Sequence, residues 1–152
     1  MNTHPRAMPF PALRALAMAL LLLLLGACAN GKKPEASLFD ELGGVDGINT
    51  LVDALIDEYR ADQRISGLFQ MTDFDYFKAR LVEDICVKSG GDCEYQGLSM
   101  EEAHSGMNIS PAEFNWFVED SRNAMIKVGL SVATQNRMLA ILARDREAVI
   151  KQ

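Results

Sequence analysis

Histidine, cysteine and basic residues are all scarce in this chain of 152 residues. The two histidines are His4 and His104, and there are three cysteines, so the composition argues against a Cys/His zinc cluster and restricts histidine catalysis to one or two positions. Lys and Arg total 15 against 21 Asp and Glu, a formal net charge of −6. A nucleic-acid partner would need a basic patch that neutralises phosphates, so no such partner is expected. The length is that of one ordinary domain.

Acidic residues are also missing from the start of the chain, where none occurs before Glu35. Two arginines there precede an apolar stretch, Ala15 to Ala27, of about 13 residues, shorter than the roughly 20 that a membrane-spanning helix needs. This pattern is typical of a secretory signal peptide. The stretch ends in Leu25-Gly26-Ala27-Cys28, which resembles the bacterial lipobox, in which the cysteine is acylated and the signal is cut just before it.

This reading divides the chain into three parts: a lipoprotein signal peptide (1–27), a tether (28–36) that begins with the lipidated Cys28, and a folded domain (37–152). The position after the lipidated cysteine holds Ala29, where an aspartate would resemble an inner-membrane retention signal. We therefore expect the lipid anchor to lie in the outer membrane of a Gram-negative cell, with the domain in the periplasm. This anchor would be the only membrane attachment. Two alternatives stay open, an ordinary cleaved signal with a chance cysteine and an uncleaved anchor. Both would still export the domain.

Apolar residues in the folded part recur at helical spacing. Between Asp46 and Ala61 they form one face that is expected to be buried: Ile48, Leu51, Val52, Leu55, Ile56 and Tyr59. Capping signals predict five helix starts, at Ser37, Thr72, Ser99, Ser110 and Ser131. No stretch alternates apolar and polar residues as a half-buried strand would. The sequence therefore predicts a small all-α domain of about six helices.

One short helix carries the only histidine that signal cleavage would leave. His104 follows Met100 and precedes Met107, so it lies on an apolar stripe, and large aromatic residues are expected near the same face: Phe69, Phe77, Phe114 and Phe117. A surface histidine is the simpler interpretation. A helical domain with one imidazole, many aromatic residues and no acid–base partner, however, suggests a haem pocket, since one neutral imidazole can hold haem iron.

The chain resembles the group 1 truncated haemoglobins from Ser37 to about Val149. The motifs that it shares are Leu38-Phe39-Asp40-Glu41-Leu42-Gly43-Gly44, Gly90-Gly91, Tyr95-Gln96-Gly97 and Ala103-His104-Ser105-Gly106. The resemblance implies a two-on-two helical sandwich and haem b, with His104 as the proximal iron ligand and Phe69 packed on the haem face. It also implies that Met100, Ile109, Phe114 and Phe117 line the pocket.

The distal side departs from that family. Where many members have a tyrosine this chain has Ile56, where others have a glutamine it has Leu81, and Phe77 takes the position that faces the ligand most directly. A hydrogen-bond donor stabilises bound O2 by about 1–3 kcal/mol, so the absence of the donor weakens O2 retention by about ten- to a hundredfold. We therefore expect a five-coordinate ferrous haem better suited to NO or CO, with Arg80 placed near a haem propionate.

Cys86 and Cys93 lie close in the sequence on either side of Gly90-Gly91. An exported protein permits a disulfide between them, and one loop of this length would add roughly 2–3 kcal/mol of stability. Two free buried thiols are the alternative. Sequence spacing alone does not show whether the two Cα atoms are close enough.

Three functions stay open for such a domain. The first is reversible binding of a diatomic gas (O2, NO or CO), as a reservoir, sensor or scavenger. The second is a haem enzyme, an NO dioxygenase or a weak peroxidase, and either would need an electron donor that the sequence does not identify. The third is a structural lipoprotein that kept the fold without haem. Acidic pairs such as Asp57-Glu58, Glu83-Asp84 and Glu101-Glu102 are interpreted as surface charge.

Overall fold

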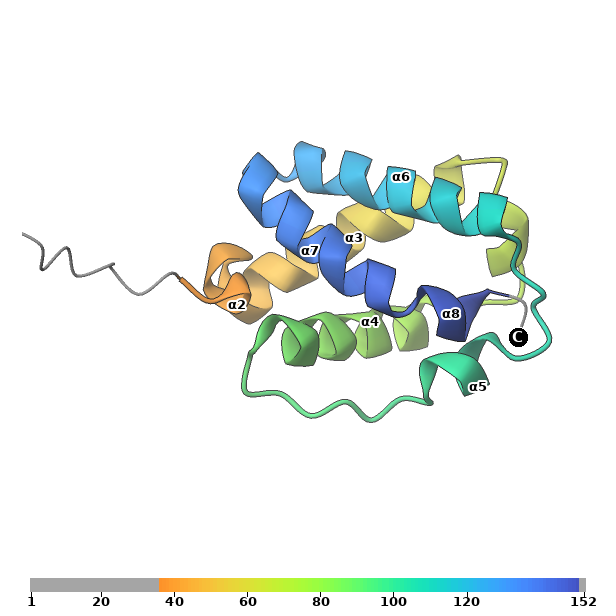
Figure 1. Cartoon of the computed structure of the whole chain (residues 1–152), viewed down its shortest axis with the longest axis horizontal. Coiled ribbons are helices and arrows are strands. Elements are labelled where there is room, and N and C mark those ends of the chain that lie inside the picture. The colour runs from red at the N-terminus through yellow and green to blue at the C-terminus, as the bar shows by residue number, and fades with distance from the viewer. Residues whose placement is uncertain (1–35, 151–152) are drawn as a thin grey trace, which may run out of the picture. The chain divides into compact units, whose positions relative to one another are not determined.

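The computed structural model describes residues 36–150, and every regular element in that range is helical (Figure 1). The elements are α2 (Leu38–Glu41), α3 (Gly44–Ala61), the 3-10 helix η2 (Ser66–Phe69), α4 (Phe74–Ser89), α5 (Met100–His104), α6 (Pro111–Lys127), α7 (Val132–Arg144) and α8 (Arg146–Val149). The predicted all-α class is confirmed. The predicted signal peptide, Cys28 and all but the last residue of the tether lie outside the described residues.

The four long helices form two pairs that pack on each other. α3 packs against both α4 and α6, and α7 packs against the same two helices from the other side (Figure 1). The short helix α5 lies beside α8, near the end of the bundle at which α6 begins (Figure 1). This is the two-on-two sandwich that the sequence predicts. None of the helices among residues 36–150 is long and apolar enough to cross a membrane.

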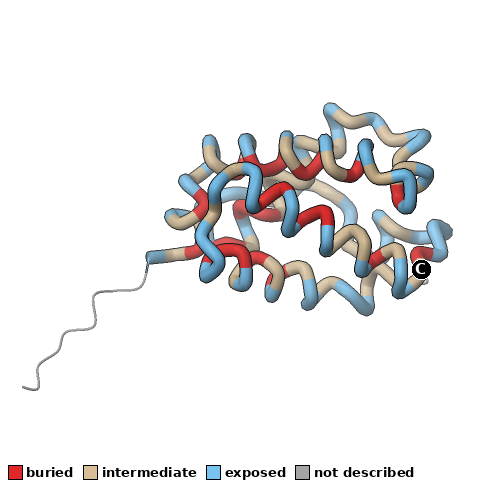
Figure 2. The backbone as a smooth tube through the Cα atoms, turned by 90° about the horizontal axis from the view of Figure 1, so that it is seen from above, coloured by how far each residue is buried: buried red, intermediate tan, exposed pale blue. Residues whose placement is uncertain are grey.

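The apolar face predicted on α3 forms the centre of the core. All six of its residues are buried: Ile48, Leu51, Val52, Leu55, Ile56 and Tyr59. Their partners include Ile85 on α4, Met125 on α6 and Met138 on α7, and the buried positions face inward on these helices (Figure 2). Because burying one large apolar side chain contributes about 1.5–3 kcal/mol, this face accounts for much of the driving force that holds α3 in place.

Most of the predicted helix starts are confirmed by hydrogen bonds. The side chains of Ser37, Ser99, Ser110 and Ser131 each accept a bond from a backbone N–H in the first turn. The prediction for α4 was wrong by one residue, because the cap is the carboxylate of Asp73, which accepts bonds from two backbone N–H groups, and not Thr72. The negative charge of a carboxylate at this position also interacts favourably with the partial positive charge of the helix N-terminus.

The predicted last helix is interrupted. The sequence indicates one helix from Ser131, but the structure ends α7 at Arg144 and begins α8 after Asp145. Lys88 Nζ on α4 lies 2.6 Å from Asp145 Oδ2 and 2.8 Å from Asp84 Oδ2. This bridge fixes the corner at Asp145, from which α8 reaches α5.

The loop between α4 and α5 is tied back to α4. Gly90 ends α4 with a φ of 93°, a left-handed conformation that favours glycine. Cys86 and Cys93 have Cα atoms 6.1 Å apart and are joined by a disulfide. Farther along, the backbone N–H of Gln96 donates to Glu83 Oε2 at 3.0 Å. The loop therefore reaches α5 along a restrained path.

Candidate functional site

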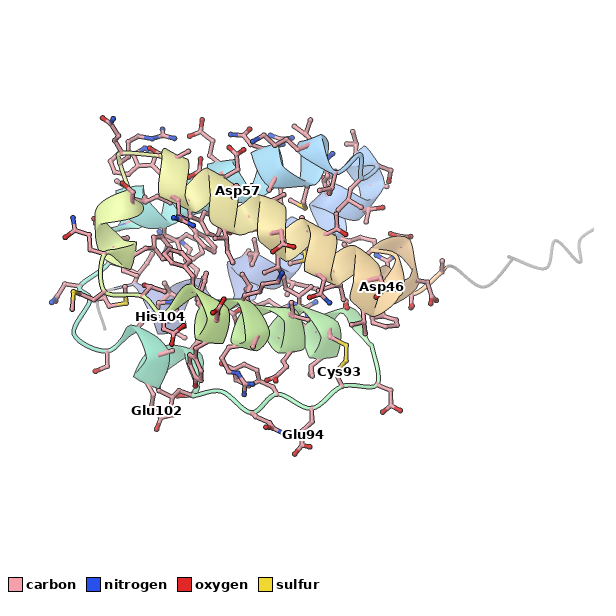
Figure 3. All side chains as sticks on the ribbon, turned by 180° about the vertical axis from the view of Figure 1, so that it is seen from behind. Asp46, Asp57, Cys93, Glu94, Glu102 and His104 are labelled. Carbon is pink, nitrogen blue, oxygen red and sulfur yellow. A yellow bond between two sulfur atoms is a disulfide. The ribbon has the colours of Figure 1, made fainter. Side chains whose placement is uncertain are left out.

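His104 ends α5, a helix of five residues that begins with a complete capping box between Ser99 and Glu102. Its Nδ1 lies 2.7 Å from the carbonyl oxygen of Met100. Since a carbonyl oxygen only accepts, Nδ1 must carry the hydrogen, and the lone pair of the neutral ring is then on Nε2. A ring held in this way is the usual form of a metal-binding histidine. Figure 3 shows His104 between α5 and α4, with Glu102 along the outer edge of the molecule.

A cavity of about 410 Å³ opens beside His104. Every predicted cofactor-binding residue except Ile56 lies on its wall. The predicted residues on its wall are Phe69, Phe77, Leu81, Met100, Ile109, Phe114 and Phe117. These come from η2, α4, α5, α6 and the segment before α6, so the fold brings together residues that are far apart in the sequence. The wall around them is largely apolar, as expected for a site that takes a hydrophobic group.

Ile56 is the predicted residue that does not lie on this wall. Its side chain is buried in the core cluster, and Ile56 does not line the cavity. The nearer layer consists of Phe69 and Phe117, which lie against Tyr59 on the same helix as Ile56, with ring centroids 5.6 Å and 4.6 Å from the tyrosine ring. The helix α3 therefore supports the cavity from behind, and the aromatic residues in front of it form the wall.

Tyr59 cannot offer its hydroxyl to the cavity. The ring is fully buried, and its oxygen lies 2.8 Å from Ser121 Oγ on α6. Burial raises the pKa of Tyr59 far above its usual range, so the phenol stays protonated. The hydrogen bond to Ser121 turns the polar end of the side chain away from the aromatic wall.

The polar part of the cavity wall includes Arg80. Its Nη2 lies 2.6 Å from Glu83 Oε1, and its guanidinium carbon lies 5.4 Å from the centroid of the Tyr76 ring. The Nε of Arg80 is buried and has no hydrogen-bond partner. A buried, unpaired donor on a cation costs free energy, and an anionic acceptor that entered the cavity would satisfy it.

Sequence reasoning missed a second polar group of wall residues. Asp84, Tyr95 and Asp145 all line the cavity, although the Glu83-Asp84 pair was interpreted as surface charge. Burial raises the pKa of the Asp84 carboxyl, against the lowering effect of its hydrogen bond to Lys88. The i, i+4 spacing of Asp84 and Lys88 could have indicated that pair, but nothing in the sequence signals that Asp145 joins it.

Comparison with known proteins identifies the fold family. A model of the bacterial-like globins matches residues 37–151. The chain belongs to the bacterial-like globins. This agrees with the resemblance to group 1 truncated haemoglobins on the motifs around Gly43, Gly90 and His104.

Individual relatives share about a quarter of their aligned residues with this globin. A group 1 truncated haemoglobin from Tetrahymena pyriformis is 25% identical over 118 residues, covering 78% of this chain and 97% of the relative. GlbN, a group 1 truncated haemoglobin from Mycolicibacterium paratuberculosis, is 27% identical over 112 residues, covering 74% and 82%. The crystal structure of the Tetrahymena protein in its Fe(III) form superposes with a TM-score of 0.74 at 24% identity, covering 77% of this chain and all of that one.

A further solved structure has the same arrangement. The 2/2 haemoglobin from Synechococcus, crystallised in the cyanomet state with covalently attached haem, gives a TM-score of 0.71 at 22% identity, covering 76% of this globin and 98% of that chain. At these identities the likeness supports the two-on-two fold. The cavity of this globin fits a haem on its own observations, namely a lone pair on His104 Nε2, an apolar wall and an unpaired donor on Arg80.

Proposed function

We propose that this globin binds haem b, that His104 would be the single protein ligand of the iron, and that the haem-loaded protein takes up a diatomic gas. The observation that supports this most directly is the hydrogen bond from His104 Nδ1 to the Met100 carbonyl, which leaves Nε2 as the free ligand atom at the cavity. Haem supplies an iron with one open position for a gas. The protein supplies the imidazole, the orientation and the polarity around it.

Each wall group has a role in this proposal. Phe69, Phe114 and Phe117 cover the flat faces of the porphyrin with apolar surface, which excludes water. Arg80 pairs with a propionate, and the acceptor satisfies its buried Nε. Glu83 holds the guanidinium in position and also binds the loop through Gln96. The same carboxylate therefore links the propionate end of the cavity to the segment that leads to His104.

The wall of the cavity on α4 sets the preference between gases. Phe77 and Leu81 line it and offer no hydrogen-bond donor, and Tyr59 is turned away to Ser121. Of the donors on the same helix, Arg80 is held by Glu83 and is assigned to a propionate, and Tyr76 is largely exposed. O2 depends on such a donor more than NO or CO does, because the bound molecule becomes partly negative. We therefore propose that this globin retains NO or CO well and O2 poorly. The same absence disfavours an NO dioxygenase, which needs a lasting O2 complex.

Absorption spectra of the ferric, ferrous and CO-bound protein test the proposal. We expect a Soret band and a high-spin five-coordinate ferrous spectrum without added ligand. In the variant His104→Ala the Soret band should be lost, and in the matched control Glu101→Ala, an exposed residue of the same helix, it should stay. A wild-type protein without a Soret band would instead favour the haem-free structural lipoprotein. A six-coordinate low-spin ferrous spectrum would refute the single protein ligand.

Rapid mixing of the O2-saturated ferrous protein with NO separates gas binding from enzymatic turnover. We expect too little of the O2 complex to give fast, stoichiometric nitrate formation. Nitrate production over many cycles with an added reductant would favour the NO dioxygenase, and would also require an electron donor in the cell. Peroxide-dependent oxidation of a dye tests the peroxidase alternative in the same preparation.

We also propose that the globin is an exported lipoprotein acylated on Cys28, held at the periplasmic face of the outer membrane. The apolar stretch before Leu25-Gly26-Ala27-Cys28 supports this, as does a disulfide between Cys86 and Cys93, which an oxidising compartment maintains. Metabolic labelling with palmitate tests it. Label in the wild type but not in Cys28→Ser is expected, with separated inner and outer membranes showing the location.

A further inference from the structure

A second cluster of charged groups lies away from His104, where the end of α3 meets α6. Asp62 follows the last residue of α3, and Asp120 is a buried residue of α6 with a side chain only 4% exposed. Arg64 is the cation nearest to both. Asp120 Oδ2 is buried without a hydrogen-bond partner, which is unusual for a carboxylate. Such an environment disfavours the charged form of the carboxyl and favours the protonated form.

Arg64 is already committed to other acceptors. Its Nε lies 2.8 Å from Asp62 Oδ2, its Nη2 lies 2.7 Å from the same oxygen, and its Nη1 lies 3.1 Å from Glu119 Oε2. The distance from Nη2 to Asp120 Oδ1 is 3.9 Å, too long for a hydrogen bond. An ionised Asp120 would therefore be a buried charge with weak compensation, next to a second carboxylate.

The remaining ionisable groups near Asp120 do not offset its charge. Glu58 and Tyr59 lie on α3 and Asp62 directly follows it, and on α6 Glu119 is the sequence neighbour of Asp120. Glu58 pairs with Lys127, so that lysine is engaged elsewhere. Burial first, and then the charge and the hydrogen bond of Asp62, raise the pKa of Asp120 to about 6.

The segment that Asp62 organises leads directly to the cavity. The carbonyl oxygen of Asp62 accepts the backbone N–H groups of Ile65 at 3.2 Å and Ser66 at 2.8 Å, and its carboxylate accepts the N–H of Arg64 at 2.8 Å. Ile65 and, farther along, Phe69 line the cavity. We call residues 62–69 the connector. Its position depends on how firmly Asp62 and Arg64 are held against α6.

We propose that Asp62 and Asp120 form a pH-sensitive latch around Arg64: while the buried Asp120 carboxyl keeps its proton the connector stays against α6, and release of that proton to solvent leaves two carboxylates near one arginine, loosens the connector and eases entry to the cavity. The device acts between α3 and α6 and needs no group at the iron. Once both carboxyl groups are ionised they repel each other. Arg64 contacts Asp62 and Glu119 closely and makes no short contact with Asp120, so it offsets this repulsion only weakly. The effect on gas entry rests on the proposed haem binding, whereas the motion of the connector does not.

Amide hydrogen exchange of the full-length protein tests the latch. The protection factors of the Ile65 and Ser66 amides, corrected for the intrinsic pH dependence of exchange, should fall about tenfold between pH 5 and pH 7. In Asp120→Asn they should not change with pH. The control Asp57→Asn replaces an exposed carboxylate of α3 and should keep the wild-type trend (Figure 3). Constant protection in the wild type, or an unchanged trend in Asp120→Asn, would overturn the proposal.

Two further measurements keep the test decisive. The carboxyl ¹³C shift of Asp120 in the wild type should titrate near pH 6, and a midpoint below pH 4.5 would overturn the latch even if Asp120→Asn did not fold. In the ferrous haem-loaded protein, CO association should quicken over the same pH range. If amide exchange shows the trend and CO association does not, the connector moves without controlling entry. A failure to bind haem would leave the exchange result standing.

Discussion

Nδ1 of His104 and the carbonyl oxygen of Met100, one helical turn earlier, lie 2.7 Å apart and fix the orientation of the imidazole. Both residues belong to α5, which has five residues and none that is buried. The direction of the proposed iron ligand is therefore set inside a helix that contributes little to the core. The capping box of Ser99 and Glu102 is then the main local interaction that keeps the helix formed.

Removal of that cap should weaken haem retention. Ser99→Ala removes the oxygen that accepts the N–H of Glu102, and loss of such a cap costs about 1 kcal/mol. We expect haem transfer to an acceptor globin to be about fivefold faster than in the wild type. Ser37→Ala removes the same kind of cap from α2 and should leave haem transfer unchanged. Equal transfer rates in all three proteins would argue against a role of the cap.

A donor introduced on the apolar wall should slow O2 release. Leu81→Gln places an amide on the face of α4 that lines the cavity, and a hydrogen bond to bound O2 contributes about 1–3 kcal/mol. The O2 dissociation rate should fall about ten- to a hundredfold, while the CO rate changes much less. The isosteric control Leu81→Met adds no donor and should leave O2 release as in the wild type. Stopped-flow displacement of O2 by CO measures the O2 dissociation rate, and displacement of CO by NO measures the CO dissociation rate.

The free energy of unfolding should be greatest near pH 5. A carboxyl with a raised pKa binds its proton more tightly in the folded state, so the contribution of Asp120 falls as the pH rises from about 4 to about 6. Asp62, Glu102 and Glu113 have lowered pKa values because of hydrogen bonds to their carboxylates, so their contributions are lost at lower pH. Urea unfolding at pH 3, 5 and 7 measures the profile. Asp120→Asn should abolish the decline between pH 5 and pH 7.

Loss of the disulfide should lower stability without changing the fold. Cys93→Ser opens the ring that joins α4 to the following loop, at a cost of roughly 2–3 kcal/mol. Reduction of the wild type should have nearly the same effect on the denaturation midpoint, and reduction of Cys93→Ser none. Thiol titration of the mature, unfolded protein is the direct check. Two free thiols besides Cys28 would show that the bridge is absent.

The sequence predicted the helices well where one face met the core. Every residue of the predicted face of α3 is buried, because a 3.6-residue period records burial directly. The same period could not tell which buried residue meets the cavity, so Ile56 was predicted for the wall, whereas it is buried in the core and Phe69 and Phe117 line the cavity. Which of two buried surfaces a residue faces depends on how the neighbouring helices pack, and that information is not local.

The sequence also did not predict the polar contacts between distant segments. Lys88 and Asp145 are 57 positions apart, and their ion pair lies at the break between α7 and α8. Asp84 carries an ordinary surface-type sequence pattern, yet it lines the cavity because Lys88 covers its charge. His104 was found because it is the only histidine after the predicted signal peptide.

The exposure of α5 bears on how long the protein survives in a cell. A five-residue helix with no buried side chain cannot remain folded on packing of its own. Where no haem is bound to its histidine, we expect the segment from Leu98 to Asn108, with exposed Glu101 and Glu102 near its centre, to become a substrate for proteases. We expect the haem-free molecule to be degraded at this segment first, so that haem supply would set the abundance of the protein.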